Sequence, residues 1–134
     1  MMKKKAKFIL SSLCVLLLLM FIQIPNTVNA STGLEFNEFN FPDNNFRRAI
    51  KESFPGYTKD NFLTTEEISN IYSLDVSEEG IKNLKGIEYF INLKYLNISV
   101  NNIEELDLSK NENLKSLEAS NNQLLKKLIL PKNI

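Results

Sequence analysis

The 134-residue sequence contains no histidine, and its one cysteine, Cys14, lies inside an apolar run near the N-terminus. Without histidine the chain lacks the usual general base near neutral pH and the commonest zinc ligand. Beyond Cys14 there is no thiol for a disulfide, a thiolate zinc site or a cysteine nucleophile. The four glycines are scattered singly, so no glycine-rich phosphate loop is present. These absences predict that the protein is not an enzyme and has no cofactor and no resident metal.

Neither the acidic nor the basic residues form a cluster that indicates a catalytic site or a binding site for an anionic partner. Adjacent acidic pairs occur at Glu66/Glu67, Glu78/Glu79 and Glu104/Glu105. Such neighbours on exposed turns diverge, whereas a glycosidase needs two carboxyl groups that converge on one bond. Lysine and arginine are interspersed with acidic residues, which argues against a nucleic acid or an anionic membrane surface as partner.

The first thirty residues have the pattern of a secretory signal peptide. Its basic start, apolar run and small-ended cleavage sequence lie at Lys3–Lys7, 8–24 and Val28–Ala30. We expect cleavage after Ala30. The alternative is an uncleaved membrane anchor, because an apolar stretch of about 17 residues is at the lower limit for spanning a bilayer. Contact with a membrane is expected only through this segment, if it is retained.

Residues 31–134 suffice for one small domain, near the size at which a single core is marginally sufficient. The signal segment contains four of the sixteen basic residues and none of the sixteen acidic ones. After cleavage, twelve basic residues would therefore face sixteen acidic ones, giving a net charge of −4. This mild acidity also argues against an anionic partner surface.

An internal repeat is the strongest signal in the sequence. Residues 93–103 read LKYLNISVNNI and residues 114–124 read LKSLEASNNQL, so the apolar positions match at a shift of 21. Both fit the leucine-rich-repeat pattern L-x-x-L-x-L-x-x-N-x-L, with Ile or Ala substituting at some positions. The predicted structural positions are Leu93, Leu96, Ile98, Asn101 and Ile103 in one copy and Leu114, Leu117, Ala119, Asn122 and Leu124 in the next.

Two weaker repetitions extend this pattern. A looser copy runs through Ile71, Leu74, Val76 and Ile81, with Glu79 in place of the asparagine. The second half of the turn repeats as LDLSKN at 106–111 and LILPKN at 128–133, a shift of 22, which places one inserted residue in a loop. Leu106 and Leu108 are therefore predicted to be structural positions too.

The spacing has a direct physical reading. In each short strand, alternation turns Leu96 and Ile98 inward and leaves Tyr95, Asn97 and Ser99 on the opposite face. An asparagine at 101 or 122 can bond backbone groups that the following bend leaves without partners. One coil cannot bury its own apolar face, whereas stacked coils can.

The repeats resemble those of bacterial leucine-rich-repeat proteins, and the segment 81–93 resembles the linking segment of internalin-type repeats. The resemblance implies an α/β solenoid of short parallel strands with irregular or 3-10 outer turns over residues 71–134. About two and a half repeats are expected there, with no C-terminal cap, behind a small helical N-terminal cap at 31–70. The richness in Lys, Asn, Ile and Leu fits a low-GC, Gram-positive bacterium.

Residues 36–70 contain two helix-start signals. Asp43 can cap a helix whose apolar residues share one face, namely Phe46, Ala49, Ile50 and Phe54. A second short helix is predicted after Leu63, where Thr64 and Glu67 fit a capping box and Leu63 can pack on Ile68. The segment resembles the helical cap of internalin-like proteins, which is often likened to an EF-hand.

Residues 56–67 can be aligned with the calcium-binding loop of an EF-hand, but they lack most of its ligands. With Leu63 at loop position eight and Glu67 at position twelve, Gly56 and Thr58 occupy positions one and three, and Asn61 replaces the glycine of position six. Only Asp60 and Glu67 would be good ligands, so we expect no calcium site.

The outward side chains of the strands are the expected binding surface. In arrays of this kind the strands form a concave sheet, on which successive coils align the same positions. Tyr95 is the expected anchor because aromatic residues often dominate interface energies, although it could instead only shield the strand. The full predicted set is Ser73, Asp75, Ser77, Tyr95, Asn97, Ser99, Ser116, Glu118 and Ser120.

The last residues, Leu130–Ile134, resemble an L-P-x-T-G wall-anchoring signal only superficially, because the Thr-Gly is absent. They align instead with the half-repeat at 106–111. An uncovered last coil would expose apolar side chains and a free strand edge. We therefore expect the N-terminal part of a longer array, a truncated reading frame, or a protein whose last coil is covered by a partner.

Three functional hypotheses follow. The first is an extracellular protein-protein interaction module, secreted or associated with the cell surface, whose protein partner belongs to a host or to a cell surface. The second is an N-terminal targeting or spacer fragment of a larger secreted or surface protein. The third is a nonfunctional fragment with no stable fold. Family resemblance favours the first, by analogy.

Overall fold

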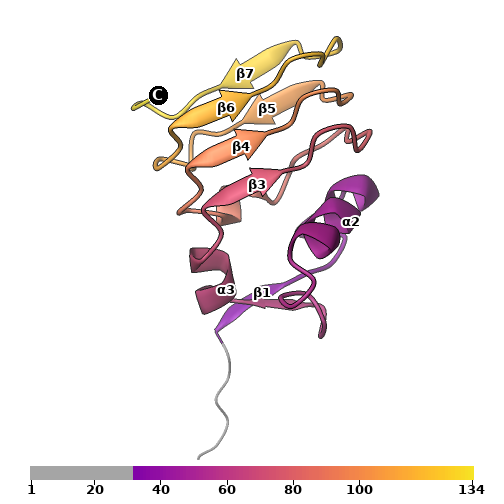
Figure 1. Cartoon of the computed structure of the whole chain (residues 1–134), viewed down its shortest axis with the longest axis vertical. Helices are drawn as coiled ribbons and strands as arrows, with labels where there is room; N and C mark the ends of the chain where they lie inside the picture. Colours follow the sequence, from indigo (N-terminus) through magenta and orange to yellow (C-terminus); the bar gives the residue numbers. More distant parts are fainter. Residues whose placement is uncertain (1–31) are drawn as a thin grey trace, which may run out of the picture. The chain divides into compact units, whose positions relative to one another are not determined.

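Short strands and helices follow one another along residues 32–134, the part of the chain that the computed structural model describes (Figure 1). The signal segment and its cleavage after Ala30 lie outside the described residues and stay predictions. No helix of the described part is long and apolar enough to cross a membrane. In chain order the elements are β1 (Gly33–Glu35), α2 (Asn44–Ser53), β2 (Phe62–Thr64), α3 (Thr65–Ser69), β3 (Ser73–Asp75), η1 (Ile87–Tyr89), β4 (Tyr95–Asn97), β5 (Glu105–Asp107), β6 (Ser116–Glu118) and β7 (Lys127–Ile129).

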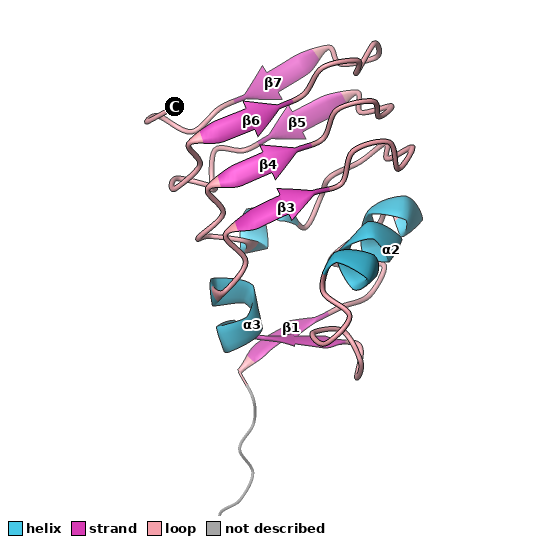
Figure 2. Cartoon of the chain, in the orientation of Figure 1, coloured by secondary structure: helices cyan, strands magenta, loops and turns pink. Residues whose placement is uncertain are grey.

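Three parallel strands, β3, β4 and β6, form one sheet of the stacked coils (Figure 2). β4 pairs with β6 at Leu96↔Leu117, which confirms the shift of 21 predicted from the repeat. β3 joins at Leu74↔Leu96, a shift of 22, so the looser first copy is also a coil. Leu74 and Leu96 are buried and their strand neighbours are not, as period-two alternation requires.

The outer halves of the later coils differ from the prediction of irregular or 3-10 turns. β5 and β7 pair in parallel at Leu106↔Leu128, the shift of 22 seen in the sequence. A 3-10 helix, η1, occupies the outer half of the first coil. The prediction was wrong for the second and third coils because two successive L-x-L segments alternate with period two and stack in register, which favours a parallel ladder over a tight turn.

Buried asparagines join each coil to the one before it. Asn101 is 4% exposed, and its Oδ1 accepts from Ile81 N at 2.9 Å. Its Nδ2 donates to Val76 O and Ile98 O, each at 2.9 Å. Asn122 repeats the arrangement one coil later, donating to Ile98 O at 2.9 Å and accepting from Ile103 N at 3.3 Å. The signature asparagine therefore supplies the bonds that the sheet cannot make at the bend.

The predicted interior positions are buried in the middle coil and less so in the last. Leu124 is a clear exception, with 47% of its surface exposed, whereas Leu125 packs against the core. The inserted residue of the last coil falls between Asn122 and β7, which moves Leu125 rather than Leu124 to the level of Ile103. Among the other predicted positions, Leu117, Ala119 and Asn122 are half-buried, while Leu93, Leu96, Ile98, Asn101, Ile103, Leu106, Leu108 and Leu114 are buried.

The N-terminal segment contains both predicted helices and a strand pair that was not predicted. Asp43 Oδ1 accepts from Phe46 N at 3.0 Å at the start of α2. Thr64 and Glu67 form the capping box of α3. In addition, β1 and β2 pair antiparallel, with Leu34 opposite Leu63. A description of this segment as purely helical is therefore incomplete.

Side chains of the N-terminal segment bind the first coil where a preceding coil would otherwise do so. The second oxygen of Asp43 accepts from Lys82 N at 2.9 Å and Asn83 N at 3.1 Å. Glu79, which replaces the repeat asparagine, pairs with Arg48 of α2 at 2.7 Å. At position 79 the first coil has glutamate instead of asparagine, which fits its neighbour there, helix α2 rather than another coil.

Aromatic rings fill the space between this segment and the first coil. Phe41 is fully buried and its ring centroid lies 4.9 to 6.1 Å from those of four neighbours. Gly86, at φ 107°, lies directly against the Phe41 ring. A side chain at this glycine would meet both a strained backbone and an occupied space. The neighbouring rings belong to Phe36, Phe46, Tyr89 and Phe90.

Replacing Asn101 by alanine should lower the free energy of unfolding by about 3 kcal/mol. The substitution leaves Ile81 N and Val76 O without partners, whereas Ile98 O keeps its bond from Asn122; each buried group left without a partner costs about 1–3 kcal/mol before water relieves part of the loss. Urea denaturation of the two proteins measures the difference. Asn102→Ala is the matched control, because Asn102 is exposed, and it should change stability by less than about 0.5 kcal/mol. Equal losses in the two variants would contradict the role assigned to Asn101.

Gly86→Ala should destabilise the fold by about 2 kcal/mol or more, because a methyl group there overlaps the Phe41 ring and the backbone has a positive φ. Gly56→Ala serves as the control, since a Cβ at Gly56 meets no atom within 4 Å. It should leave the melting temperature unchanged or raise it slightly. Thermal melts followed by circular dichroism compare the two, and a stable Gly86→Ala protein would refute the proposed packing.

Candidate functional site

The nine residues predicted as a binding surface lie on one face of the β3–β4–β6 sheet or directly beyond its strands, and this set is the front face. The parallel register aligns them in rows across the coils. The rows are Ser73–Tyr95–Ser116, Asp75–Asn97–Glu118 and Ser77–Ser99–Ser120. Ser73, Asp75, Tyr95, Glu118 and Ser120 are exposed, and Ser77, Asn97, Ser99 and Ser116 are half-buried.

Hydrogen bonds hold several of these polar side chains in place. Asn97 Nδ2 donates to Asp75 Oδ2 at 3.2 Å, and Ser120 Oγ donates to Ser99 Oγ at 3.1 Å. Along the chain, Asp75 Oδ1 accepts from both Ser77 N and Ser77 Oγ, and Asn97 Oδ1 accepts from Ser99 N. Five of the nine side chains of the front face therefore have hydrogen-bond partners within the face.

The carboxyl group of Asp75 stays ionised across the neutral and mildly acidic range. The hydroxyl of Ser77, and then its amide, hold the pKa of Asp75 below the usual 3.8. Because hydrogen bonds to a carboxylate favour the charged form, the stabilisation is present above that value and is lost as the pH falls through the lowered pKa. The front face thus presents a fixed negative charge at Asp75.

Tyr95 is the one aromatic residue of the front face. Its side chain is 53% exposed and lies between Ser73 and Ser116 on the neighbouring strands. These neighbours are too small to cover the ring. The arrangement leaves an aromatic surface exposed beside these two serines.

An aromatic and basic group beside the front face was missed in the sequence analysis. Tyr72 is 46% exposed, and Lys94 Nζ lies 5.1 Å from its ring centroid, within the range of a cation–π contact. Both residues immediately precede a strand, and the backbone bond from Lys94 N to Tyr72 O places them side by side. The shift of 22 between positions 72 and 94 was the signal that could have identified this pair.

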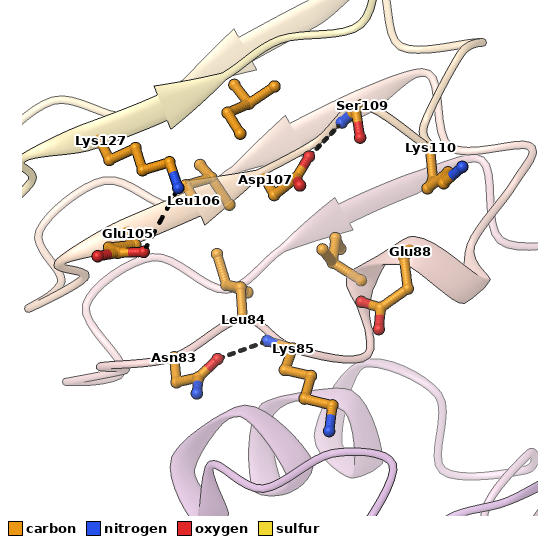
Figure 3. Close-up of a pocket in the computed structure, with 12 residues that line it drawn as sticks. Asn83, Leu84, Lys85, Glu88, Glu105, Leu106, Asp107, Ser109, Lys110 and Lys127 are labelled. Atoms are coloured by element: carbon orange, nitrogen blue, oxygen red, sulfur yellow. Dashed lines mark hydrogen bonds and ion pairs between the residues drawn. The ribbon is translucent and has the colours of Figure 1, made fainter.

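A cavity of about 390 Å³ lies on the other side of the coils, between segments 83–88 and 105–110 (Figure 3). We call it the back groove; Lys127 and Ile129 of β7 complete its lining. Glu105 and Lys127 approach to 4.0 Å across its rim. The Ser109 hydroxyl and amide lower the pKa of Asp107, and Lys127 and Lys110 add to this effect.

Several of the acidic residues considered for catalysis or metal binding have separate structural partners. Glu67 belongs to the capping box, Glu79 pairs with Arg48, and Glu104 lies 3.5 Å from Lys126. Asp60 Oδ1 accepts from the amide of Phe62. Within residues 32–134, no three acidic side chains gather as a group that could hold a metal ion.

Known proteins resemble the chain in sequence and in fold. Internalin J of Listeria monocytogenes serotype 4b (strain F2365) is 34% identical over 88 residues, which cover 66% of this chain and 9% of that protein. The crystal structure of an internalin (InlF) from Listeria monocytogenes str. 4b F2365 has a TM-score of 0.60 at 27% identity, over 77% of this chain and 34% of the other. The functional domain of InlJ from Listeria monocytogenes has a TM-score of 0.55 at 28% identity, over 76% and 24%.

These matches cover most of this chain but only a small part of each similar protein. The chain spans less than a tenth of the curated relative and about a third or a quarter of the two solved structures. No known family profile matches the sequence. The parallel ladder, the asparagine positions and the similarity to several internalins agree with one another. The chain is an internalin-like leucine-rich-repeat protein.

Proposed function

We propose that this protein is an extracellular protein-protein interaction module that binds its partner through the front face. The observation that carries the proposal is the exposed Tyr95 ring, which lies between the small side chains of Ser73 and Ser116 on a face whose other two rows are partly held by hydrogen bonds. An aromatic anchor within an ordered polar surface is a common source of interface energy. Internalin-like relatives support a protein rather than a small molecule as the partner.

Order in the free protein favours binding because less side-chain freedom is lost on association. Asn97 and Ser99 are held by bonds to Asp75, Ser120 and each other. Asp75 and Glu118 give one row of the face a negative character. A partner surface with an apolar recess for Tyr95 and a basic or amide group opposite Asp75 would complement it.

We also propose that the protein is exported, so that the front face is exposed outside the cell. The basic start, apolar run and Ala30 cleavage site of residues 1–30 support secretion or association with the cell surface. No catalytic step is included in the proposal, and Glu67, Glu79 and Glu104 serve as a helix cap or as ion-pair partners. The partner belongs to a host or to a cell surface.

Tyr95→Ala should weaken partner binding at least about tenfold, because an anchor residue of this type contributes about 2 kcal/mol or more. The exported protein is tested against an array of extracellular and cell-surface proteins, and affinities are measured by biolayer interferometry. Phe39→Ala is the control, since Phe39 is 78% exposed but lies outside the front face. Loss of binding in the control but not in Tyr95→Ala would reject the front face as the site.

The second candidate is that these residues form the targeting or spacer portion of a larger secreted or surface protein. The observation favouring it is that the chain matches only 9% of Internalin J. Intact mass of the native product from culture medium and cell envelope distinguishes the two. The mass of residues 31–134 in the medium supports the small module, and a much larger species supports the spacer.

A further inference from the structure

The back groove exists because the first coil does not continue the β5–β7 ladder. A shift of 22 from β5 leads to Asn83–Lys85, where a third strand would be expected. Two of the groups that would face β5 have other partners. Leu84 O accepts from Ile87 N at 3.0 Å, and Gly86 N donates to Glu88 Oε2 at 2.7 Å.

One edge of β5 is consequently open toward the groove. Its bonds to β7 use Glu104 O and Leu108 N, which are even-numbered positions. In a parallel strand the backbone groups of alternate residues face opposite edges, so those of Glu105 and Asp107 face the first coil. The four groups are the N–H and C=O of Glu105 and of Asp107, both of which are exposed residues. Outside the strand pairs, no backbone hydrogen bond among the described residues uses any of these four groups.

The equivalent positions of β4 show what such groups do when a strand is present. Tyr95 N donates to Tyr72 O, and Asn97 O accepts from Val76 N, so this edge of β4 is fully used by the first coil. Glu105 and Asp107 hold the same positions in β5. The fold thus presents a strand edge beside a cavity at a place where the repeat pattern calls for another strand.

We propose that the back groove binds an extended peptide segment of another protein, which adds to β5 as a strand. Main-chain bonds to Glu105 and Asp107 supply the affinity, as in other β-strand additions. A volume of about 390 Å³ lies within the usual range of ligand sites. This site is separate from the front face and does not depend on the function proposed for it.

The lining determines which peptide fits. Ile129, 36% exposed, is the main apolar lining residue, because Leu84, Ile87 and Leu106 are each only 2% exposed; this limited apolar surface suits small or β-branched side chains on the inward-facing positions of the peptide. The charged lining residues comprise three lysines and three acidic residues, so the groove has no net charge and selects a segment without net charge. These residues are Lys85, Lys110 and Lys127 against Glu88, Glu105 and Asp107 (Figure 3).

A blocked pentapeptide of alternating threonine and valine is a suitable probe, because the bonds are to the main chain. It is titrated into the full-length, isotope-labelled protein and followed by NMR. The amide protons of Glu105 and Asp107 should move downfield, and their hydrogen exchange should slow roughly tenfold at saturation. The same peptide N-methylated at alternate residues cannot donate to β5 and should leave these signals unchanged.

Two protein variants separate this site from others. Asp107→Pro removes one donor at an edge position that tolerates proline, and should abolish the shifts at Glu105. Tyr95→Ala should leave peptide binding unchanged. The proposal is overturned if the unmodified peptide shifts neither Glu105 nor Asp107, if the N-methylated peptide binds equally well, or if the shifts map to β6 or β7. Because the N-methylated probe tests the bonds from the ligand side, the result stands even if Asp107→Pro does not fold.

Discussion

The hydrogen bonds of buried asparagine side chains are the constraint on which the stacked coils depend. A strand of three residues offers few ladder bonds, and the chain then bends, leaving amides and carbonyls inside the protein. Asn101 satisfies groups of two coils at once, and Asn122 does the same one coil further on. On the outer half, Asn111 donates to Ile87 O and Phe90 O of the preceding coil. Replacement of these amides by apolar groups would fill the space but leave the backbone unsatisfied.

The first coil shows how such an array begins without a preceding coil. Asp43 performs two tasks, because one oxygen caps α2 and the other binds the amides of Lys82 and Asn83. Arg48 holds Glu79 where the repeat has asparagine. Further along the same coil, Leu84 O accepts from Ile87 N and Gly86 N donates to Glu88. These bonds use groups that a third strand would direct toward β5, and the back groove lies at this place.

Local sequence signals predicted the features that depend on local chemistry. The shifts of 21 and 22 predicted the strand register, and the caps at Asp43 and Thr64 are where the side chains indicated. Features set by distant contacts were missed. The pairing of β1 with β2 joins residues about thirty positions apart, and Leu125 rather than Leu124 turns inward because of where the inserted residue is accommodated. For the candidate site, the register predicted which side chains share a face, whereas the open edge of β5 follows from the bonds that Leu84 O and Gly86 N make within the first coil, which the repeat pattern does not indicate.

The two faces of the coils would recognise partners by different means. On the front face the backbone of β4 is bonded on both edges, so only side chains such as Tyr95 and Asn97 are available for contact. Selectivity there depends on the identity of each side chain, and single substitutions can alter it. At the back groove the available groups of β5 belong to the main chain, which every residue carries. The front face therefore suits selection of one partner surface, while the groove suits an extended segment chosen mainly by shape and by the absence of charge.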